Sequence, residues 1–223
     1  MKIKAKIILP HVYLLTYPTR YELCMSFVRI GEFYESPKFK GKYFTLEQYM
    51  DYWCKEFGNG SFTYPSTWNG YNLPSDVFKK WIKMFEDVSP REDIVLEKIG
   101  GLLMKEYGCF EKDNEKYYII AVHEEDGRKS MQHAIEHETA HALYYLYPNY
   151  KKICDGLLKD ISKKKYENAK KILISMGYCN DVINDELQAY YSSANGSFTS
   201  LPEFTVNFDI FKKSLKKRSN KKV

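Results

Sequence analysis

The segment KYYIIAVHEEDGRKSMQHAIEHETAHALYYLYP, residues 116–148, decides the fold. It opens with a run of β-favouring residues, Lys116 to His123, and the following Glu, Asp and Gly residues are typical of a turn. We expect Ser130 to cap a helix that runs to about Tyr147 and ends before Pro148. The segment therefore predicts a strand joined by a short turn to a long helix.

The rest of the chain alternates short β-favouring runs with helical patterns. Thr45 and Gln48 have the spacing of a capping box, and Pro90 and Gly108 are placed to start and stop a helix. The expected strands are residues 2–9 and 23–30, and the expected loop is 58–74. The expected helices are 45–57, 75–85, 90–107, 150–176 (as one helix or two) and 181–194. These elements predict an α+β fold.

Composition sets the class of protein. The 44% hydrophobic and 28% charged residues are ordinary for a globular chain, and no stretch approaches 18 apolar residues. The five cysteines form no Cys-x-x-Cys pair, so we expect no disulfide framework and a cytoplasmic location without a signal peptide. Much of the +5 net charge comes from Lys212 to Lys222. We expect residues 1–110 to pack on a catalytic part, 111–205, and 206–223 to be a basic, flexible tail.

The motif that carries chemistry is His137-Glu138-Thr139-Ala140-His141. Residues four apart on a helix lie one turn above each other, so the two histidines can bind one cation. Glu138 then lies at the edge of the site, where it can accept a proton from a metal-bound water. The competing interpretation is a buried amphipathic helix whose histidines are only hydrogen-bonded.

The third ligand must be a carboxylate, because no histidine follows His141. Asp185 and Glu186 lie within an expected helix among apolar residues, where an anion is costly unless it is paired or metal-bound. Glu186 is the preferred ligand and Asp185 the competitor, which faces about 100° away and could support another group. The alternative is that both acids are solvated.

This combination of motif and downstream glutamate resembles the gluzincin branch of zinc metallopeptidases, over residues 116–194. The resemblance implies a zincin-like fold, in which a small mixed sheet packs on the active-site helix and the C-terminal half is helical. It implies Zn²⁺ bound by His137, His141 and Glu186, with Glu138 as general base. The family often has an aspartate four residues after the third ligand, and this chain has Tyr190 there. Tyr190 or Tyr191 could instead donate a hydrogen bond to an oxyanion.

Two further histidines need an interpretation. His133 and His137 flank Glu136 in an inverted His-x-x-Glu-His pattern, with Glu136 as the base. His133 lies near the expected helix start, so we favour the forward motif and regard His133 as a substrate-contacting residue. His123 at the end of the strand could also contact substrate, and the alternative is an ordinary turn histidine.

Three functions compete. The first is hydrolysis of a peptide or protein substrate, with residues 117–123 as an edge strand that pairs with it. The second is a non-catalytic zinc module that binds a partner. The third is a metallopeptidase acting on nucleic-acid-bound proteins, suggested by the basic tail and by Lys163 to Lys165. We expect no membrane partner.

Overall fold

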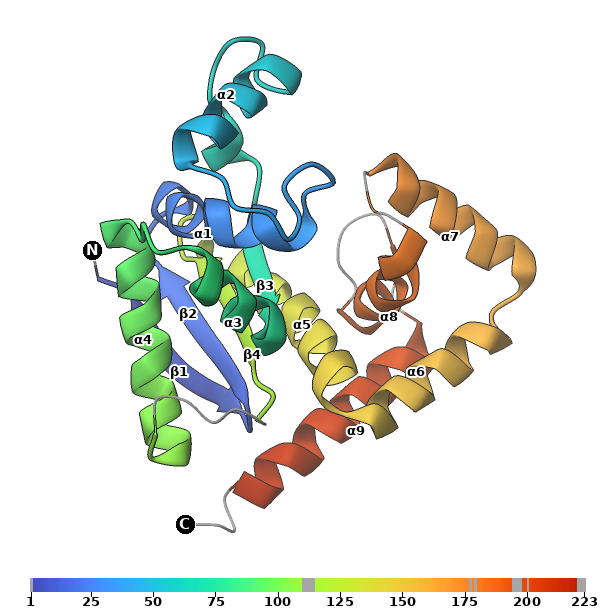
Figure 1. Cartoon of the computed structure of the whole chain (residues 1–223). Coiled ribbons are helices and arrows are strands. Elements are labelled where there is room, and N and C mark those ends of the chain that lie inside the picture. Colours follow the sequence, from blue (N-terminus) through green and yellow to red (C-terminus); the bar gives the residue numbers. More distant parts are fainter. Residues whose placement is uncertain are drawn as a thin grey trace. The chain divides into compact units, whose positions relative to one another are not determined.

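The computed structural model describes residues 2–109, 115–176, 178, 180–193, 198–199 and 201–219 (Figure 1). These residues form a mixed α+β protein, rich in helix, with one four-stranded sheet. The chain divides into two compact units, residues 1–131 and 132–223. The division falls inside helix α5 (Gly127–Leu146), whereas the sequence predicted boundaries after residues 110 and 205. The first boundary was placed too early because strand β4 (Tyr118–His123) completes the sheet of the first unit.

The sheet has the strand order β1-β2-β4-β3. Strands β1 (Lys4–Leu9) and β2 (Val12–Tyr17) form an antiparallel hairpin, β2 pairs with β4 in parallel, and β3 (Gly70–Pro74) pairs with β4 antiparallel. The predicted strand at 117–123 is therefore confirmed, but its prediction as an edge strand is wrong. Because β2 and β3 occupy both of its sides, β4 has no free edge for an extended substrate.

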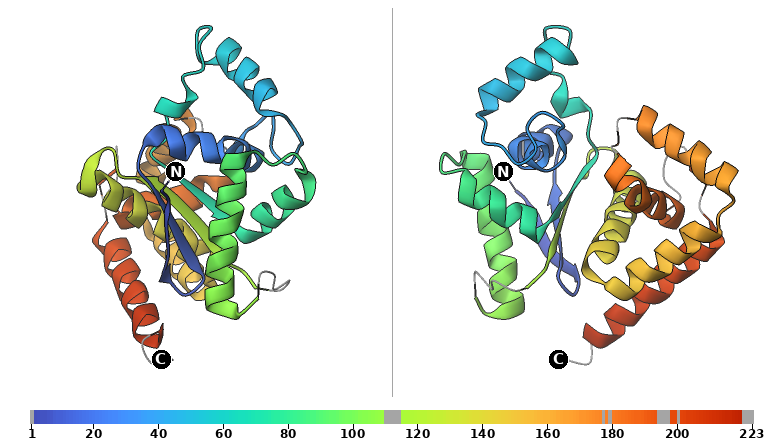
Figure 2. Two further views of the ribbon diagram at one scale, coloured as in Figure 1. Left: turned by 90° about the vertical axis from the view of Figure 1, so that its left-hand side faces the viewer. Right: turned by 45° about the vertical axis from the view of Figure 1, so that its right-hand side comes forward.

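Alternate residues of the two central strands face the hydrophobic core of the first unit. Tyr13, Leu15 and Tyr17 of β2 belong to this core, as do Ile119 and Ala121 of β4. Helices α1 (Arg20–Glu35), α3 (Ser75–Met84) and α4 (Pro90–Tyr107) lie on the same side of the sheet (Figure 2). All residues of β2 and β4 are buried, which explains their continuous apolar character.

Helix α1 corrects the expected strand at residues 23–30. The Thr19 side chain accepts a hydrogen bond from the Glu22 amide and starts the helix. Leu23, Phe27 and Ile30 then follow the spacing of one helical face and are buried. This periodic burial overrides the β propensity of the segment.

The other predicted helices of the first unit are confirmed. Helix α2 (Leu46–Glu56) has the expected capping box, and α4 starts at Pro90 as expected, with a capping box of Ser89 and Glu92 that was not predicted. Gly108 ends α4 with a φ of 72°. The expected loop 58–74 contains a short 3₁₀ helix, η1 (Tyr64–Ser66), and ends in β3. Arg29 of α1 forms a buried ion pair with Glu92 at 2.6 Å and a partly exposed one with Asp87 at 2.9 Å.

Helix α5 begins at Gly127, where φ is 84°, so Ser130 lies inside the helix and does not cap it. The second unit continues with α6 (Pro148–Asp160), α7 (Lys163–Ser175), η2 (Asn180–Val182), α8 (Ile183–Ser193) and α9 (Pro202–Ser219). The break expected within 150–176 falls at Ile161 and Ser162. Helix α8 packs against α6, α7 and α9, so most of its residues are buried.

Helix α9 corrects the prediction of a flexible tail for residues 206–219. Phe204, Phe208 and Leu215 are buried, and Tyr191 of α8 packs its ring on Phe204 at 5.5 Å between centroids. The lysines that suggested a tail occupy the remaining faces of this amphipathic helix, which explains why the basic composition was misleading.

Two further findings concern the environment of the chain. Cys24, Cys54, Cys109 and Cys154 are free thiols. Among the described residues, no helix has both the length and the apolar character needed to cross a bilayer.

Candidate metal centre

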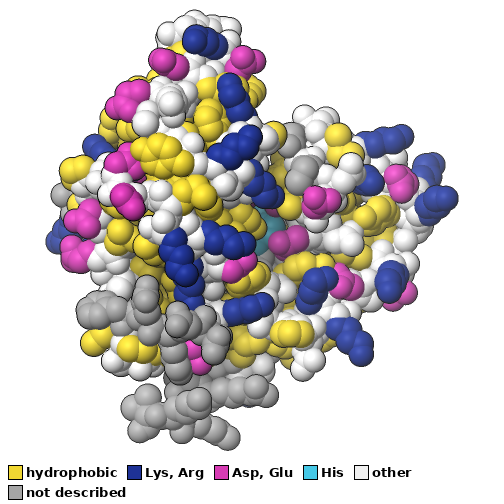
Figure 3. All heavy atoms as spheres, in the orientation of Figure 1, with side chains coloured by type: hydrophobic (Ala, Val, Ile, Leu, Met, Phe, Trp, Pro, Cys, Tyr) yellow, Lys and Arg dark blue, Asp and Glu magenta, His cyan; other side chains and the backbone are white. Residues whose placement is uncertain are grey.

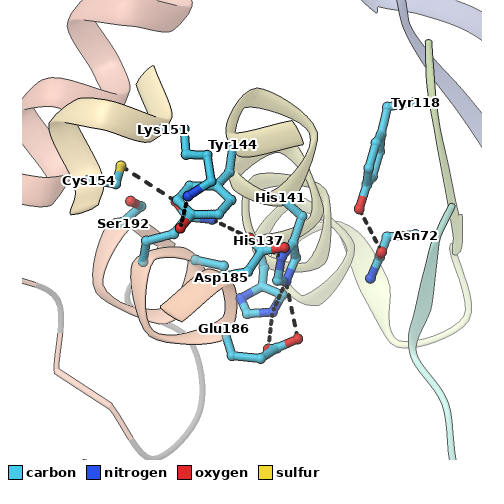
Figure 4. Close-up of polar contacts among 12 residues, drawn as sticks. Asn72, Tyr118, His137, His141, Tyr144, Lys151, Cys154, Asp185, Glu186 and Ser192 are labelled. Carbon is cyan, nitrogen blue, oxygen red and sulfur yellow. Dashed lines mark hydrogen bonds and ion pairs between the residues drawn. The ribbon is translucent and has the colours of Figure 1, made fainter. Parts of the chain in front are cut away.

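Two adjacent helices of the second unit bring together the three residues predicted as metal ligands. His137 and His141 project from one face of α5, one turn apart, and Glu186 projects toward them from α8 (Figure 4). All three are buried: the exposed fraction is 7% for His137, 3% for His141 and 7% for Glu186. One ligand atom from each lies within 4.8 Å of the others. Burying charged and polar groups this close together costs folding free energy unless they share a proton or a cation.

The distances fit a tetrahedral cation. The Nε2 atoms of His137 and His141 are 3.3 Å apart. The Glu186 carboxylate oxygens lie 3.8 Å from His137 Nε2 and 3.7 Å from His141 Nε2. Zinc with ligands at 2.0–2.1 Å in tetrahedral geometry separates them by about 3.3 Å. The nitrogen pair therefore already has the required spacing, and the carboxylate needs to approach by a few tenths of an ångström.

A second set of contacts fixes the orientation of both imidazole rings. His141 Nδ1 lies 2.9 Å from an Asp185 carboxylate oxygen, which also accepts a hydrogen bond from the Gln188 amide at 3.0 Å. His137 Nδ1 lies 3.4 Å from Ser193 Oγ, whose own hydroxyl donates to the Ala189 carbonyl at 2.7 Å. Both partners can accept a hydrogen bond from Nδ1, so in the neutral, metal-binding form of each ring the proton is on Nδ1 and the Nε2 lone pair is directed to the other ring and Glu186.

The electrostatics of the cluster are those of closely spaced buried groups. Burial, with a contribution from His141, places the pKa of His137 well below its usual value. Burial alone would also lower the pKa of His141, but Asp185 and Glu186 outweigh it and raise the pKa to about 10. Burial raises the pKa of Glu186 to about 7, although His141 opposes the shift. A cation would satisfy these groups, since all three then bind it in their deprotonated forms.

Glu138 is buried beside this cluster. Its carboxylate is close enough to raise the pKa of both His141 and Glu186. The position agrees with an acid at the edge of the cluster that does not belong to the ligand set.

Tyr190 and Tyr191 have different surroundings. The ring of Tyr190 packs on the His137 ring, with centroids 4.6 Å apart, and its hydroxyl lies 3.4 Å from that of Tyr178. The Tyr178 hydroxyl in turn hydrogen-bonds Glu186. Tyr191 instead packs on Phe198 and Phe204. Of the two tyrosines considered from the sequence, Tyr190 is therefore the one that lies beside the cluster.

The remaining predicted residues do not join the cluster. His133 is exposed on α5, and Glu136 accepts from the Gln132 amide at 3.2 Å and lies 4.0 Å from Lys212 Nζ. The inverted motif therefore has one of its two histidines outside the group that can share a cation. His123 belongs to the first unit, where its buried Nε2 accepts a hydrogen bond from Arg20 at 3.4 Å.

Sequence reasoning missed Ser193 and Tyr178. Ser193 lies seven residues after Glu186, which places both on one face of α8, and this spacing was an available signal. Tyr178 precedes the helix, so no periodicity relates it to the cluster.

No protein-family model, no curated protein and no solved structure matches this chain. The resemblance to gluzincins thus depends on the sequence motif and on the geometry of the cluster.

Proposed function

We propose that the chain is a zinc-dependent metallopeptidase of zincin-like fold that hydrolyses peptide bonds. The observation that carries this proposal is the convergence of two Nε2 lone pairs and one carboxylate from α5 and α8, with both Nδ1 atoms already engaged. Structural sites in proteins are usually closed by four protein ligands, whereas catalytic zinc sites use three. The donor set of two histidines and one glutamate is the one found in peptide hydrolysis.

His137, His141 and Glu186 would hold the metal. Zinc at this position would act as a Lewis acid that polarises a carbonyl oxygen and lowers the pKa of water towards about 7. Asp185 and Ser193 keep both imidazoles in the tautomer that presents Nε2. The chain thereby arranges the ligands before any metal arrives.

Glu138 would carry the proton transfer. Its carboxylate accepts a proton from the attacking water and then delivers that proton to the leaving amine. Its burial beside the cluster supports this role, because it places the carboxylate next to the three residues that would hold the metal. Tyr190 is our proposal for the oxyanion donor, since its hydroxyl is placed beside the cluster next to that of Tyr178.

A structural zinc site is the second candidate. The burial of all three ligands favours it, because a catalytic metal must be reached by substrate. The two functions differ in what they require of Glu138. A structural site needs no general base, whereas hydrolysis does.

The test combines metal analysis with proteolysis of fluorescein-labelled casein. The purified protein should contain close to one zinc per chain, and His137→Ala, His141→Ala and Glu186→Ala should each lose it. Glu138→Gln should keep the metal and lose hydrolysis. Glu136→Gln is the matched control, since Glu136 lies on the same helix with its side chain partly exposed, and it should keep both.

The outcomes separate the alternatives. Zinc retained in both histidine variants would show that the ligand assignment is wrong. Zinc with no proteolysis in the wild type, unchanged in Glu138→Gln, would indicate the structural site. Loss of activity in Glu136→Gln but not in Glu138→Gln would restore the inverted motif.

A further inference from the structure

The second unit holds the entire net charge of the chain. Residues 132–223 contain 15 Lys and Arg against 10 Asp and Glu, whereas residues 1–131 contain 19 of each, which leaves the +5 in the second unit. Lysine and arginine side chains gather over α6 and α7 in the space-filling view (Figure 3). Such a concentration of one charge on a surface attracts anions.

A cavity of about 560 Å³ opens within this basic region, at the junction of α6, α7 and the start of α8. We call it the α6–α7 cavity. Its polar lining consists of Lys151, Asp155, Lys159, Lys163, Tyr166 and Asn184. None of the three candidate metal ligands lines it, so it is a separate site. Its volume lies within the range of pockets that hold small molecules.

The charges of the cavity do not balance. Asp155 is its one lining acid, and that carboxylate is already engaged by Lys151 at 2.7 Å and by the Tyr144 hydroxyl. Within the described part of the chain, neither Lys159 nor Lys163 has an acidic partner within ion-pair distance. Among the described residues, Lys159 is therefore attracted to Asp155 only from beyond ion-pair distance, and neither ammonium group is held in an ion pair.

The other polar groups of the cavity are donors. The Tyr166 hydroxyl donates to Asn184 Oδ1 at 2.7 Å, which leaves the Asn184 amide NH₂ as the group that can face a ligand. Helix α7 also begins here, with Lys163 as its first residue, and the start of a helix is the positive end of its dipole. The lining thus offers positive charge and N–H groups to an acceptor.

One wall of the cavity is apolar. Leu158, Ile161 and the ring of Tyr166 line it. A ligand that fills the cavity would accordingly combine an anionic end with a small apolar or aromatic part. Two lysines that form no ion pair with a described residue match a phosphate monoester, which carries a charge of about −1.5 to −2 at neutral pH.

We propose that the α6–α7 cavity binds a small phosphate monoester, with Lys159, Lys163 and the Asn184 amide as donors to the phosphate. The apolar wall would hold the organic part of the ligand. This site is independent of the proposed hydrolysis, because it uses none of the groups of the metal cluster.

Calorimetric titration of the full chain with phenyl phosphate at low ionic strength tests the proposal. The probe combines a dianionic phosphate with an aromatic ring. The double variant Lys159→Gln/Lys163→Gln should weaken binding by about tenfold or more, because two charged contacts are lost. The matched control is Lys170→Gln/Lys171→Gln, which removes the same charge from α7 outside the cavity and should bind within about threefold of wild type.

Three results would overturn the proposal. The first is no binding of phenyl phosphate to the wild type, and the second is an equal loss in both double variants, which would indicate unspecific attraction. The third is displacement of phenyl phosphate by a DNA duplex whose binding is weakened equally in both double variants, which would indicate a surface that binds polynucleotides. Because all four lysine sites lie on the surface, thermal unfolding should show that both variants fold.

A further variant separates this site from the metal cluster. His137→Ala should bind phenyl phosphate with unchanged affinity even where it has lost zinc. Binding lost in His137→Ala but kept in the lysine double variant would place the phosphate at the metal and refute the cavity assignment.

Discussion

Asp185→Asn is the substitution that tests most directly how the metal ligands are oriented. The carboxylate accepts a hydrogen bond from His141 Nδ1 at 2.9 Å and is partly exposed, with the Gln188 amide as its second donor. The variant is isosteric, so the fold should be retained. It removes the negative charge that holds His141 in the tautomer with a free Nε2. Loss of such a partner typically weakens metal binding by about 10- to 100-fold, or about 1.4–2.7 kcal/mol.

Competition for zinc with a chromophoric chelator measures this effect. Ser193→Ala provides the contrast, because the contact of His137 with Ser193 is neutral and longer, at 3.4 Å, and we expect less than about a threefold loss. Asp181→Asn, an exposed acid just before α8, is the charge control and should bind as wild type does. A dissociation constant for Asp185→Asn within about threefold of wild type, or a larger loss in Ser193→Ala, would refute the reasoning.

Three further predictions concern stability. Arg29→Met should lower the free energy of unfolding by about 3–5 kcal/mol in urea titrations, because it leaves Glu92 buried and unpaired, and a cost below about 1 kcal/mol would contradict this. Zinc at a hundred times its dissociation constant should stabilise the second unit by about 2.7 kcal/mol, and identical melting with zinc and with a chelator would disprove metal binding to the folded state. Burial raises the pKa of Asp87, but Arg29 outweighs it and lowers the pKa. The contribution of the Asp87 carboxylate to the free energy of unfolding is therefore present at neutral pH and lost as the pH falls through its lowered pKa. The free energies of unfolding of wild type and Asp87→Asn should differ by less than about 1 kcal/mol at neutral pH and should converge in acid.

The candidate site was accessible from the sequence where local periodicity determined it. Helical spacing relates His137 to His141, and the cost of an unpaired anion among apolar residues pointed to Glu186. Both arguments need only the residues of one helix. The same is true of α2, whose capping box was predicted from four residues, and of α4, whose ends were predicted from Pro90 and Gly108.

Contacts between elements far apart in the chain were not accessible in this way. Nothing local shows that Asp185 would meet His141 Nδ1 or that Ser193 would meet His137, because the approach of α8 to α5 depends on the packing of α8 against its neighbouring helices. Strand β2 was missed because its buried residues show no alternation, and residues 23–30 were misjudged because burial decides between helix and strand there.

Helix α9 has a consequence for how the protein can be shortened. It packs against α8, where Phe204 contacts the ring of Tyr191, and the Leu201 amide donates to the Tyr191 carbonyl at 3.1 Å. A nonsense codon or a proteolytic cut near residue 200 would remove α9 from its packing against α8, the helix that supplies Glu186, and so destabilise that helix. Removing the whole of α9 to improve crystals or yield would thus weaken metal binding, even though every ligand remained in the chain.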